Sequence, residues 1–271
     1  MRFSDWEGYY QAIVQSMGYS RDRDEQVAWL LSGLMAKRRD RLAQIVDLKE
    51  LFRGRHAYVF ADGPTLEHDI ADFQFTGPTV AADGATSKLL ARGILPSVIV
   101  TDLDAPRMED LVRANAQGSI VVVHAHGDNQ RAIEEWVPRF EGRLLATTQS
   151  KPIELVHDFG GFTDGDRAVL LADHFGADPI LLVGFNFDET DQEYVRSLGD
   201  VKLKKLAWGS AIIVNLPDAD LYFFEDVADQ LRAGAAAKLA GSGSGSAGSG
   251  SGDGGVGSGG SGDGGDGHHV E

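Results

Sequence analysis

The chain contains 271 residues, of which 42% are hydrophobic and 24% charged, and it has no cysteine. Without cysteine the chain has no disulfide scaffold, zinc–thiolate site or cysteine nucleophile. With 25 basic against 41 acidic residues, the formal net charge of −16 argues against a nonspecific nucleic-acid binder, because that affinity rests on clustered Lys and Arg. A phosphorylated substrate held through a metal ion remains compatible with this charge.

The first fifty or so residues are predicted to be helical, because apolar residues recur there at helical spacing. Ser20 or Asp22 stands where a cap would begin a second helix. We interpret residues 1–52 as an N-terminal helical region whose aromatic stripe belongs to the core, and its sequence indicates no chemistry. The stripe consists of Trp6, Tyr9, Tyr10, Ile13 and Met17, and the second helical run carries Val27, Leu30, Leu31 and Leu34.

From His56 onward, short and nearly continuous apolar runs alternate with amphipathic segments. This pattern predicts an α/β fold with a buried, mainly parallel, Rossmann-like sheet flanked by helices. We assign residues 53–240 to one α/β catalytic domain. The expected strands are 56–61, 78–82, 96–101, 119–124, 144–148, 179–184 and 220–224. The expected helices are 65–73, 86–92, 108–116, 129–140, 166–175, 202–213 and 225–239.

Residues 241–271 form a tail that holds 15 of the 34 glycines and is predicted to be disordered, because it has too little apolar surface to bury. The chain has no run of about 18 apolar residues, so we expect no transmembrane helix. The N-terminal residues are acidic and aromatic, unlike a signal peptide. We therefore expect a cytoplasmic protein with no membrane or nucleic-acid partner.

Polar and acidic residues follow successive predicted strands, at the edge where an open parallel sheet binds ligands. Chance scatter in an acidic chain would put many of these carboxylates on solvated helix faces instead. The blocks, in chain order, are Asp62-Gly63-Pro64-Thr65, Asp83-Gly84-Ala85-Thr86, Thr101-Asp102-Leu103-Asp104, His124-Ala125-His126-Gly127-Asp128-Asn129, Thr147-Thr148-Gln149 and Gly160-Gly161-Phe162-Thr163-Asp164-Gly165-Asp166-Arg167.

Several carboxylates in one cleft repel one another, and a divalent cation removes that repulsion. Mg²⁺ prefers a few carboxylates together with phosphate oxygens of a substrate. Asp102 and Asp104, two residues apart, are expected to point to one side of an extended segment and to share the metal. Taken alone, such a pair has a second interpretation, in which the two aspartates cap a turn and a helix. The acidic residues at the other strand ends favour a metal–phosphate centre instead.

His124 and His126 also lie two residues apart at a strand end. For these two histidines to bind zinc, a third metal ligand at suitable spacing is missing from the sequence. Contact with a bound substrate and a purely structural role both remain open for them.

Arg167 closes the glycine-rich loop at a predicted helix start, where its guanidinium group and the backbone amides are suited to phosphate. An ion pair with Asp164 or Asp166 is the alternative. The densest basic cluster, Lys202, Lys204 and Lys205, suits either a polyphosphate or a solvated helix face.

Taken in this order, the blocks resemble the archaeal 6-hydroxymethyl-7,8-dihydropterin diphosphokinase family, and the same core is similar to thiamin pyrophosphokinase. The resemblance spans about residues 55 to 215. Its most specific parts are the His-Ala-His-Gly-Asp-Asn block at 124–129 and the Gly-Phe-Thr-Asp-Gly-Asp-Arg block at 161–167. Thr65 departs from the expected Gly-Pro-Ser form but keeps the hydroxyl group.

The resemblance implies transfer of a diphosphate from ATP to the hydroxymethyl group of a reduced pterin, with release of AMP, in folate or methanopterin synthesis. Mg²⁺ is the implied cofactor, ATP and the pterin are the implied partners, and a homo-oligomer is one option for assembly. The competing hypotheses are a nucleotide-sugar-dependent glycosyltransferase, a thiamin-type pyrophosphokinase and a binding protein without turnover.

On this hypothesis Asp102 and Asp104 hold Mg²⁺ on the ATP phosphates, and Asp83 or Asp128 supports the metal or the attacking hydroxyl group. The remaining candidates contact substrate or phosphate. They are Gly63, Pro64, Thr65, His124, His126, Asn129, Thr148, Gln149, Gly161, Thr163, Asp164, Asp166, Arg167, Lys204 and Lys205.

Overall fold

Within residues 1–187, 199–216 and 219–242, which the computed structural model describes, eight strands form one sheet. The strand order is β6-β5-β4-β3-β2-β1-β7-β8, and every neighbouring pair is parallel. The strands are β1 (Ala57–Phe60), β2 (Thr79–Ala82), β3 (Val98–Thr101), β4 (Ile120–Ala125), β5 (Leu144–Thr148), β6 (Val156–His157), β7 (Ile180–Val183) and β8 (Leu221–Phe223). The predicted α/β fold with a parallel sheet is thus confirmed.

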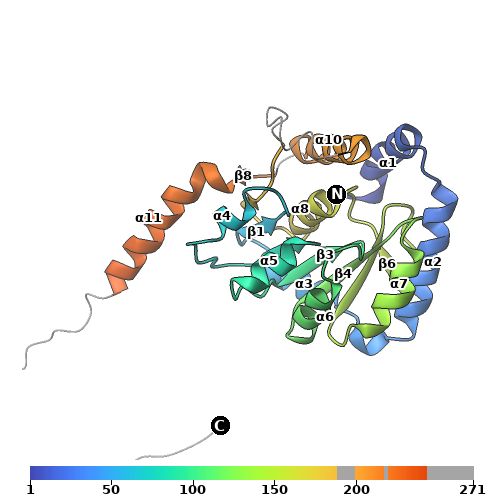
Figure 1. Ribbon diagram of the computed structural model, residues 1–271, viewed down its shortest axis with the longest axis horizontal. Helices are drawn as coiled ribbons and strands as arrows, with labels where there is room; N and C mark the ends of the chain where they lie inside the picture. The colour runs from blue at the N-terminus through green and yellow to red at the C-terminus, as the bar shows by residue number, and fades with distance from the viewer. Residues whose placement is uncertain (188–198, 217–218, 243–271) are drawn as a thin grey trace, which may run out of the picture. The chain divides into compact units, whose positions relative to one another are not determined.

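Helices connect the parallel strands and cover the sheet (Figure 1). The α-helices are α1 (Phe3–Met17), α2 (Arg21–Ala36), α3 (Ile45–Phe52), α4 (Leu66–Asp69), α5 (Ala85–Ala91), α6 (Met108–Ala116), α7 (Gln130–Trp136), α8 (Asp164–His174), α10 (Asp200–Val214) and α11 (Phe224–Ser242). Two short 3-10 helices are η1 (Arg39–Arg41) and η2 (Val137–Arg139).

The chain divides into two compact units, Met1–Gln230 and Leu231–Glu271. The first holds the whole sheet together with α1 to α10, and the second holds the last part of α11. Most of the tail predicted at 241–271 lies outside the described residues. None of the described helices is both long enough and apolar enough to cross a membrane.

The N-terminal helices share their core with the sheet. Trp6, Tyr10 and Ile13 of α1 are fully buried and belong to the same apolar cluster as strand residues such as Val59 and Val80. α2 contacts β4, β5 and β6, and Figure 1 shows it beside α7 at one end of the sheet. The prediction that the aromatic stripe is core is therefore confirmed.

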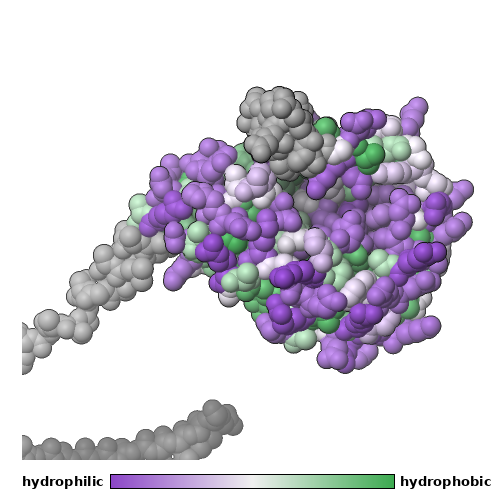
Figure 2. Space-filling model, viewed as in Figure 1, coloured by the Kyte–Doolittle hydropathy of each residue, from purple (hydrophilic) through white to green (hydrophobic). Residues whose placement is uncertain are grey.

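The predicted caps and strand ends agree with the structure, with two local differences. Ser20 is the N-cap of α2, and its hydroxyl accepts a hydrogen bond from the Arg23 backbone amide. The two-residue strand β6 was not predicted, because two residues carry no alternation signal. The helix expected over 65–73 is only the four-residue α4. The face shown in Figure 2 is mostly hydrophilic, in keeping with the charged composition.

The sheet reverses its order of connection at β1, which pairs with β2 on one side and with β7 on the other. The chain runs from β1 to β2 on one side and from β7 to β8 on the other, so the loops after β1 and β7 leave in opposite directions. An open α/β sheet binds its ligands in the crevice formed there. The acidic blocks predicted from the sequence lie at this edge, after β2 and β3.

Candidate functional site

Four carboxylates meet at the carboxyl edge of the sheet. Asp83 follows β2, Asp102 and Asp104 follow β3, and Asp164 begins α8. One side-chain oxygen from each lies within 4.8 Å of all the others. The two predicted metal ligands, Asp102 and Asp104, are therefore in one cluster, and two further carboxylates join them.

The backbone of the β3 loop turns so that both of its aspartates reach the cluster. Leu103 has a left-handed conformation with a φ of 70°, so the segment is not extended as we expected. The Thr101 hydroxyl fixes this turn, because it donates to Asp83 Oδ1 (2.6 Å) and accepts from the Leu103 amide (2.8 Å). Asp83 also has a positive φ of 41°. Residues other than glycine rarely have a positive φ. Two of them beside one cluster indicate that the surrounding structure fixes the backbone of this site.

Burial and mutual repulsion govern three of the four carboxyl groups. Burial, with the charges of Asp104 and Asp102, raises the pKa of Asp83 to about 8. Burial raises the pKa of Asp164 well above its usual range, and the Asp102 charge adds to that effect. Burial and the Asp102 charge also raise the pKa of Asp104. Anionic carboxylates are therefore costly here unless a cation joins them.

Asp102 behaves differently from its neighbours. Burial alone would raise its pKa, but the hydrogen bond from His126 (Nε2 to Oδ2, 3.3 Å) and the charge of Arg167 outweigh burial and lower it. Its other oxygen, Oδ1, is buried and has no hydrogen-bond partner among the described residues. An ionised carboxylate with a free buried oxygen, beside three more carboxylates, is a donor set that fits a hard divalent cation such as Mg²⁺.

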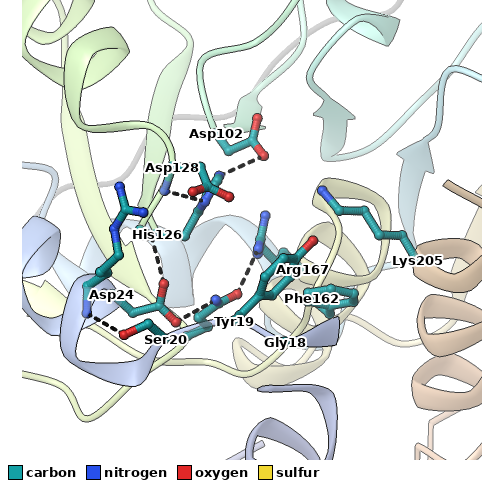
Figure 3. A pocket seen from close by; sticks show the side chains of 13 residues that line it. Gly18, Tyr19, Ser20, Asp24, Asp102, His126, Asp128, Phe162, Arg167 and Lys205 are labelled. Carbon is teal, nitrogen blue, oxygen red and sulfur yellow. Dashed lines mark hydrogen bonds and ion pairs between the residues drawn. The ribbon is translucent and has the colours of Figure 1, made fainter. Parts of the chain in front are cut away.

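A cleft of about 600 Å³, which we call the corner cleft, opens on the Asp102 side of the cluster (Figure 3). The turn between α1 and α2 forms one wall, and the loop after β4 forms another. Its lining residues are Gly18, Tyr19, Ser20, Arg23, Asp24, Asp102, His126, Gly127, Asp128, Gln149, Phe162, Arg167 and Lys205.

Asp24 connects the N-terminal helices to this cleft. Its carboxylate is 3% exposed and accepts hydrogen bonds from the Tyr10 hydroxyl (2.7 Å), the Gln149 side-chain amide (2.8 Å) and the Gly127 backbone amide (2.7 Å). The approach of α2 is so close that a Cβ on Gly127 would lie 2.9 Å from the Cβ of Arg23. One buried carboxylate thus joins α1, α2 and the loops after β4 and β5.

A second cleft of about 1120 Å³, which we call the strand-end cleft, opens on the other side of the cluster. Asp83, Asp104 and Asp164 line it, whereas Asp102 lines the corner cleft. The cluster therefore lies where the two clefts meet. Other lining residues include Asp62, Gly63, Pro106, Thr163, Asp166, Phe185, Lys202 and Ile213.

Arg167 lies between the cluster and the corner cleft. Its guanidinium group donates to Asp164 Oδ1 (3.1 Å) and to Gln149 Oε1 (3.3 Å), and the residue is 6% exposed. The alternative given for Arg167, an ion pair with Asp164, is present. Asp166 instead caps the glycine-rich loop: it is fully buried and accepts from the Phe162 amide (2.5 Å) and the Thr163 amide (2.7 Å).

Two further predicted residues have structural contacts that position the loops. Asn129 donates to the carbonyl groups of Asp102 (2.8 Å) and His124 (2.7 Å), which ties the loop after β4 to the loop after β3. His124 is buried beside a small cavity that Thr148 and Arg167 also line. Burial and the charge of Arg167 lower the pKa of His124 well below its usual range, so its ring is neutral.

The clefts divide the predicted site residues as follows. The corner cleft holds Asp102, His126, Asp128, Gln149, Arg167 and Lys205, and the strand-end cleft holds Gly63, Asp83, Asp104, Thr163, Asp164 and Asp166. His124 and Thr148 line the small cavity beneath. Pro64, Thr65, Asn129, Gly161 and Lys204 line none of these three spaces.

The sequence did not reveal the contribution of the N-terminal helices. Tyr19, Arg23 and Asp24 line the corner cleft, although we found no chemistry in that region. One signal was present: Asp24 stands on the apolar face of its helix, in line with Val27, Ala28 and Leu31, all of which are buried. An acid at such a position needs hydrogen-bond partners inside the protein.

Known proteins resemble this chain over most of its length. The family profile described as "6-hydroxymethylpterin diphosphokinase MptE-like" matches residues 35–192. A protein of Pyrococcus furiosus named 6-hydroxymethyl-7,8-dihydropterin pyrophosphokinase is 43% identical over 69% of this chain and 79% of its own length. Proteins with the same name from Methanothermobacter thermautotrophicus and Methanocaldococcus jannaschii are 38% and 32% identical, covering 79% and 80% of this chain and 94% and 97% of their own.

Proposed function

Because the chain belongs to the MptE-like 6-hydroxymethylpterin diphosphokinase family, we propose that it transfers a diphosphate group from ATP to 6-hydroxymethyl-7,8-dihydropterin, with Mg²⁺ as cofactor. The observation that carries the proposal is the cluster of four carboxylates at the carboxyl edge of the sheet. In the proposed reaction the hydroxymethyl oxygen bonds to the β-phosphorus, the bond from that phosphorus to the α-phosphate oxygen breaks, AMP leaves, and the hydroxyl proton is released. The product serves folate or methanopterin synthesis.

The proposed metal ligands are Asp102 and Asp104, supported by Asp83 and Asp164. When bound, Mg²⁺ supplies charge neutralisation for the phosphate oxygens. Thr101 holds Asp83 in the cluster by its hydrogen bond, which supports a role of Asp83 beside the metal. The carboxylate of Asp128 is outside the cluster, so we assign Asp128 to substrate contact in the corner cleft.

The remaining work of the site is positioning and charge neutralisation, since phosphoryl chemistry needs little covalent help from the protein. Arg167 and Lys205 are proposed to contact the phosphates. Asp166 holds the glycine-rich loop in place by accepting from two of its backbone amides, which keeps Arg167 at the start of α8. Because ATP is an intracellular metabolite, the proposal places the enzyme in the cytoplasm.

The test is AMP formation from ATP and Mg²⁺, measured with the pterin, with thiamin and with no acceptor, in low and in molar salt. We expect AMP only with the pterin. AMP with thiamin alone would show that the acceptor is wrong. No AMP above the no-acceptor control with either compound would contradict diphosphate transfer altogether.

A further inference from the structure

The carboxylate cluster separates two clefts, and a two-substrate reaction needs two binding places that meet at the reacting atoms. Asp102 faces the corner cleft, and Asp83, Asp104 and Asp164 face the strand-end cleft. A donor in one cleft and an acceptor in the other would both reach the cluster without overlapping. The clefts differ in charge, and charge discriminates between the substrates.

The corner cleft carries most of the positive charge. Three Arg and Lys side chains line it against three Asp side chains, and His126 lies beside them. The strand-end cleft has one Lys, Lys202, against five Asp. A nucleoside triphosphate is a polyanion, whereas the pterin is neutral, so the cations of the corner cleft attract the donor and not the acceptor.

The cations of the corner cleft are also available to a ligand. Among the described residues, Arg23 and Lys205 make no ion pair, although the chain has a formal charge of −16. The guanidinium group of Arg167 is buried, and its Nε has no hydrogen-bond partner within the described part of the chain. By contrast, the acidic Asp24 already accepts three hydrogen bonds from neutral donors.

Aromatic rings border the same cations. The rings of Tyr19 and Phe162 are 6.2 Å apart, and Lys205 Nζ lies 6.0 Å from the centroid of the Phe162 ring. Figure 3 shows Tyr19, Phe162 and Lys205 among the side chains that line this cleft. An aromatic ring next to cationic side chains suits a purine nucleotide, because the base can stack on the ring while the phosphates pair with the cations.

Resting on the proposed function, we infer that the corner cleft binds the nucleotide donor and the strand-end cleft binds the pterin acceptor. Tyr19 and Arg23 from the α1–α2 turn then contact the nucleotide, so the N-terminal helices form part of the donor site. The larger volume of the strand-end cleft does not reverse this assignment, because Lys202 is the one Lys or Arg side chain that lines it.

The test measures binding without turnover. Calorimetry with Mg²⁺ and α,β-methylene-ATP, whose α–β bridge resists cleavage, is run on wild type, Arg23→Ala, Tyr19→Ala and Lys37→Ala. Lys37, the exposed C-cap of the same helix, is the matched charge control. We expect the Arg23 and Tyr19 variants to bind the analogue about tenfold more weakly, the loss of one charged or stacking contact, and Lys37→Ala to bind it as wild type does.

The acceptor arm uses the fluorescence of 6-hydroxymethylpterin, the stable oxidised form of the substrate. We expect Arg23→Ala and Tyr19→Ala to bind it as wild type does, and Phe185→Ala in the strand-end cleft to bind it more weakly with unchanged affinity for the analogue. Weaker pterin binding by the Arg23 and Tyr19 variants, or unchanged analogue binding by both, would overturn the assignment even if wild type makes AMP. If the affinities divide as expected but no AMP forms, the assignment stands and the proposed function fails.

Discussion

Replacing Asp24 by Asn tests how the N-terminal helices are held to the catalytic edge. The carboxylate accepts from Tyr10 and Gln149 through Oδ2 and from Gly127 through Oδ1. An Asn side chain keeps one oxygen and presents an NH₂ group in place of the other. In one orientation Gly127 loses its acceptor, and in the other Tyr10 and Gln149 do.

The expected cost follows from that count. At least one buried donor loses a charge-assisted hydrogen bond, which costs about 1.5–3 kcal/mol of the free energy of unfolding. Asp24 also stands in the first turn of α2, where any acid adds about 0.3–1 kcal/mol through the helix dipole. Asp22 is exposed in the same turn and makes no hydrogen bond or ion pair with the described residues, so Asp22→Asn loses only this second contribution.

The assay is urea unfolding of wild type, Asp24→Asn and Asp22→Asn, followed by circular dichroism. We expect Asp24→Asn to be less stable than Asp22→Asn by at least about 1 kcal/mol, with the unfolding slope unchanged. Its turnover should also fall, because Gln149 links Asp24 to Arg167. Equal stability of the two variants would refute the reasoning, since the three hydrogen bonds would then contribute nothing.

Three further predictions concern the cluster and the close approach of α2. Asp102→Asn should lower turnover by about 10²–10³-fold or more at saturating Mg²⁺, whereas Asp72→Asn, an exposed control, should not; a wild-type rate for Asp102→Asn would exclude its role. The pKa of Asp83 is 3.8 in the unfolded chain and about 8 in the folded protein, so folding favours its protonated form. In metal-free protein the contribution of this group to the free energy of unfolding is therefore complete below pH 3.8 and is lost as the pH rises through 8. The gain in Tm on adding Mg²⁺ should therefore be larger at pH 8.5 than at pH 6, and a gain independent of pH would contradict a cation among these carboxylates. Gly127→Ala should destabilise the protein, because its Cβ would meet Arg23, whereas Gly33→Ala, with open space around it, should stabilise it by about 0.5–1 kcal/mol; similar shifts in urea midpoint would contradict this packing.

Local sequence signals were sufficient for the sheet and for the main acidic groups. Runs such as 120–123 are apolar and β-branched, and they form buried parallel strands with acidic blocks after their carboxyl ends. Because parallel strands end at the same edge, Asp83, Asp102 and Asp104 could be placed together from the strand order alone. The missing element was the two-residue β6, which leaves no pattern.

Tertiary contacts determined what the sequence left open. Nothing local in Asp164-Gly165-Asp166 tells which acid joins the cluster: the first does, and the second turns inward to cap its own loop. The left-handed Leu103 is likewise held by Thr101 and not by its own preference. Tyr19 and Arg23 line the corner cleft beside Asp24, whose partners Gly127 and Gln149 lie more than a hundred residues away in the sequence.

The most direct test of the central claim is to identify the products by phosphorus NMR and mass spectrometry after reaction of ATP, Mg²⁺ and 6-hydroxymethyl-7,8-dihydropterin. Diphosphate transfer predicts AMP and the pterin diphosphate in equal amounts, from attack at the β-phosphorus. ADP together with a pterin monophosphate would mean attack at the γ-phosphorus, and that result would contradict the proposed reaction while leaving the carboxylate cluster as a metal site.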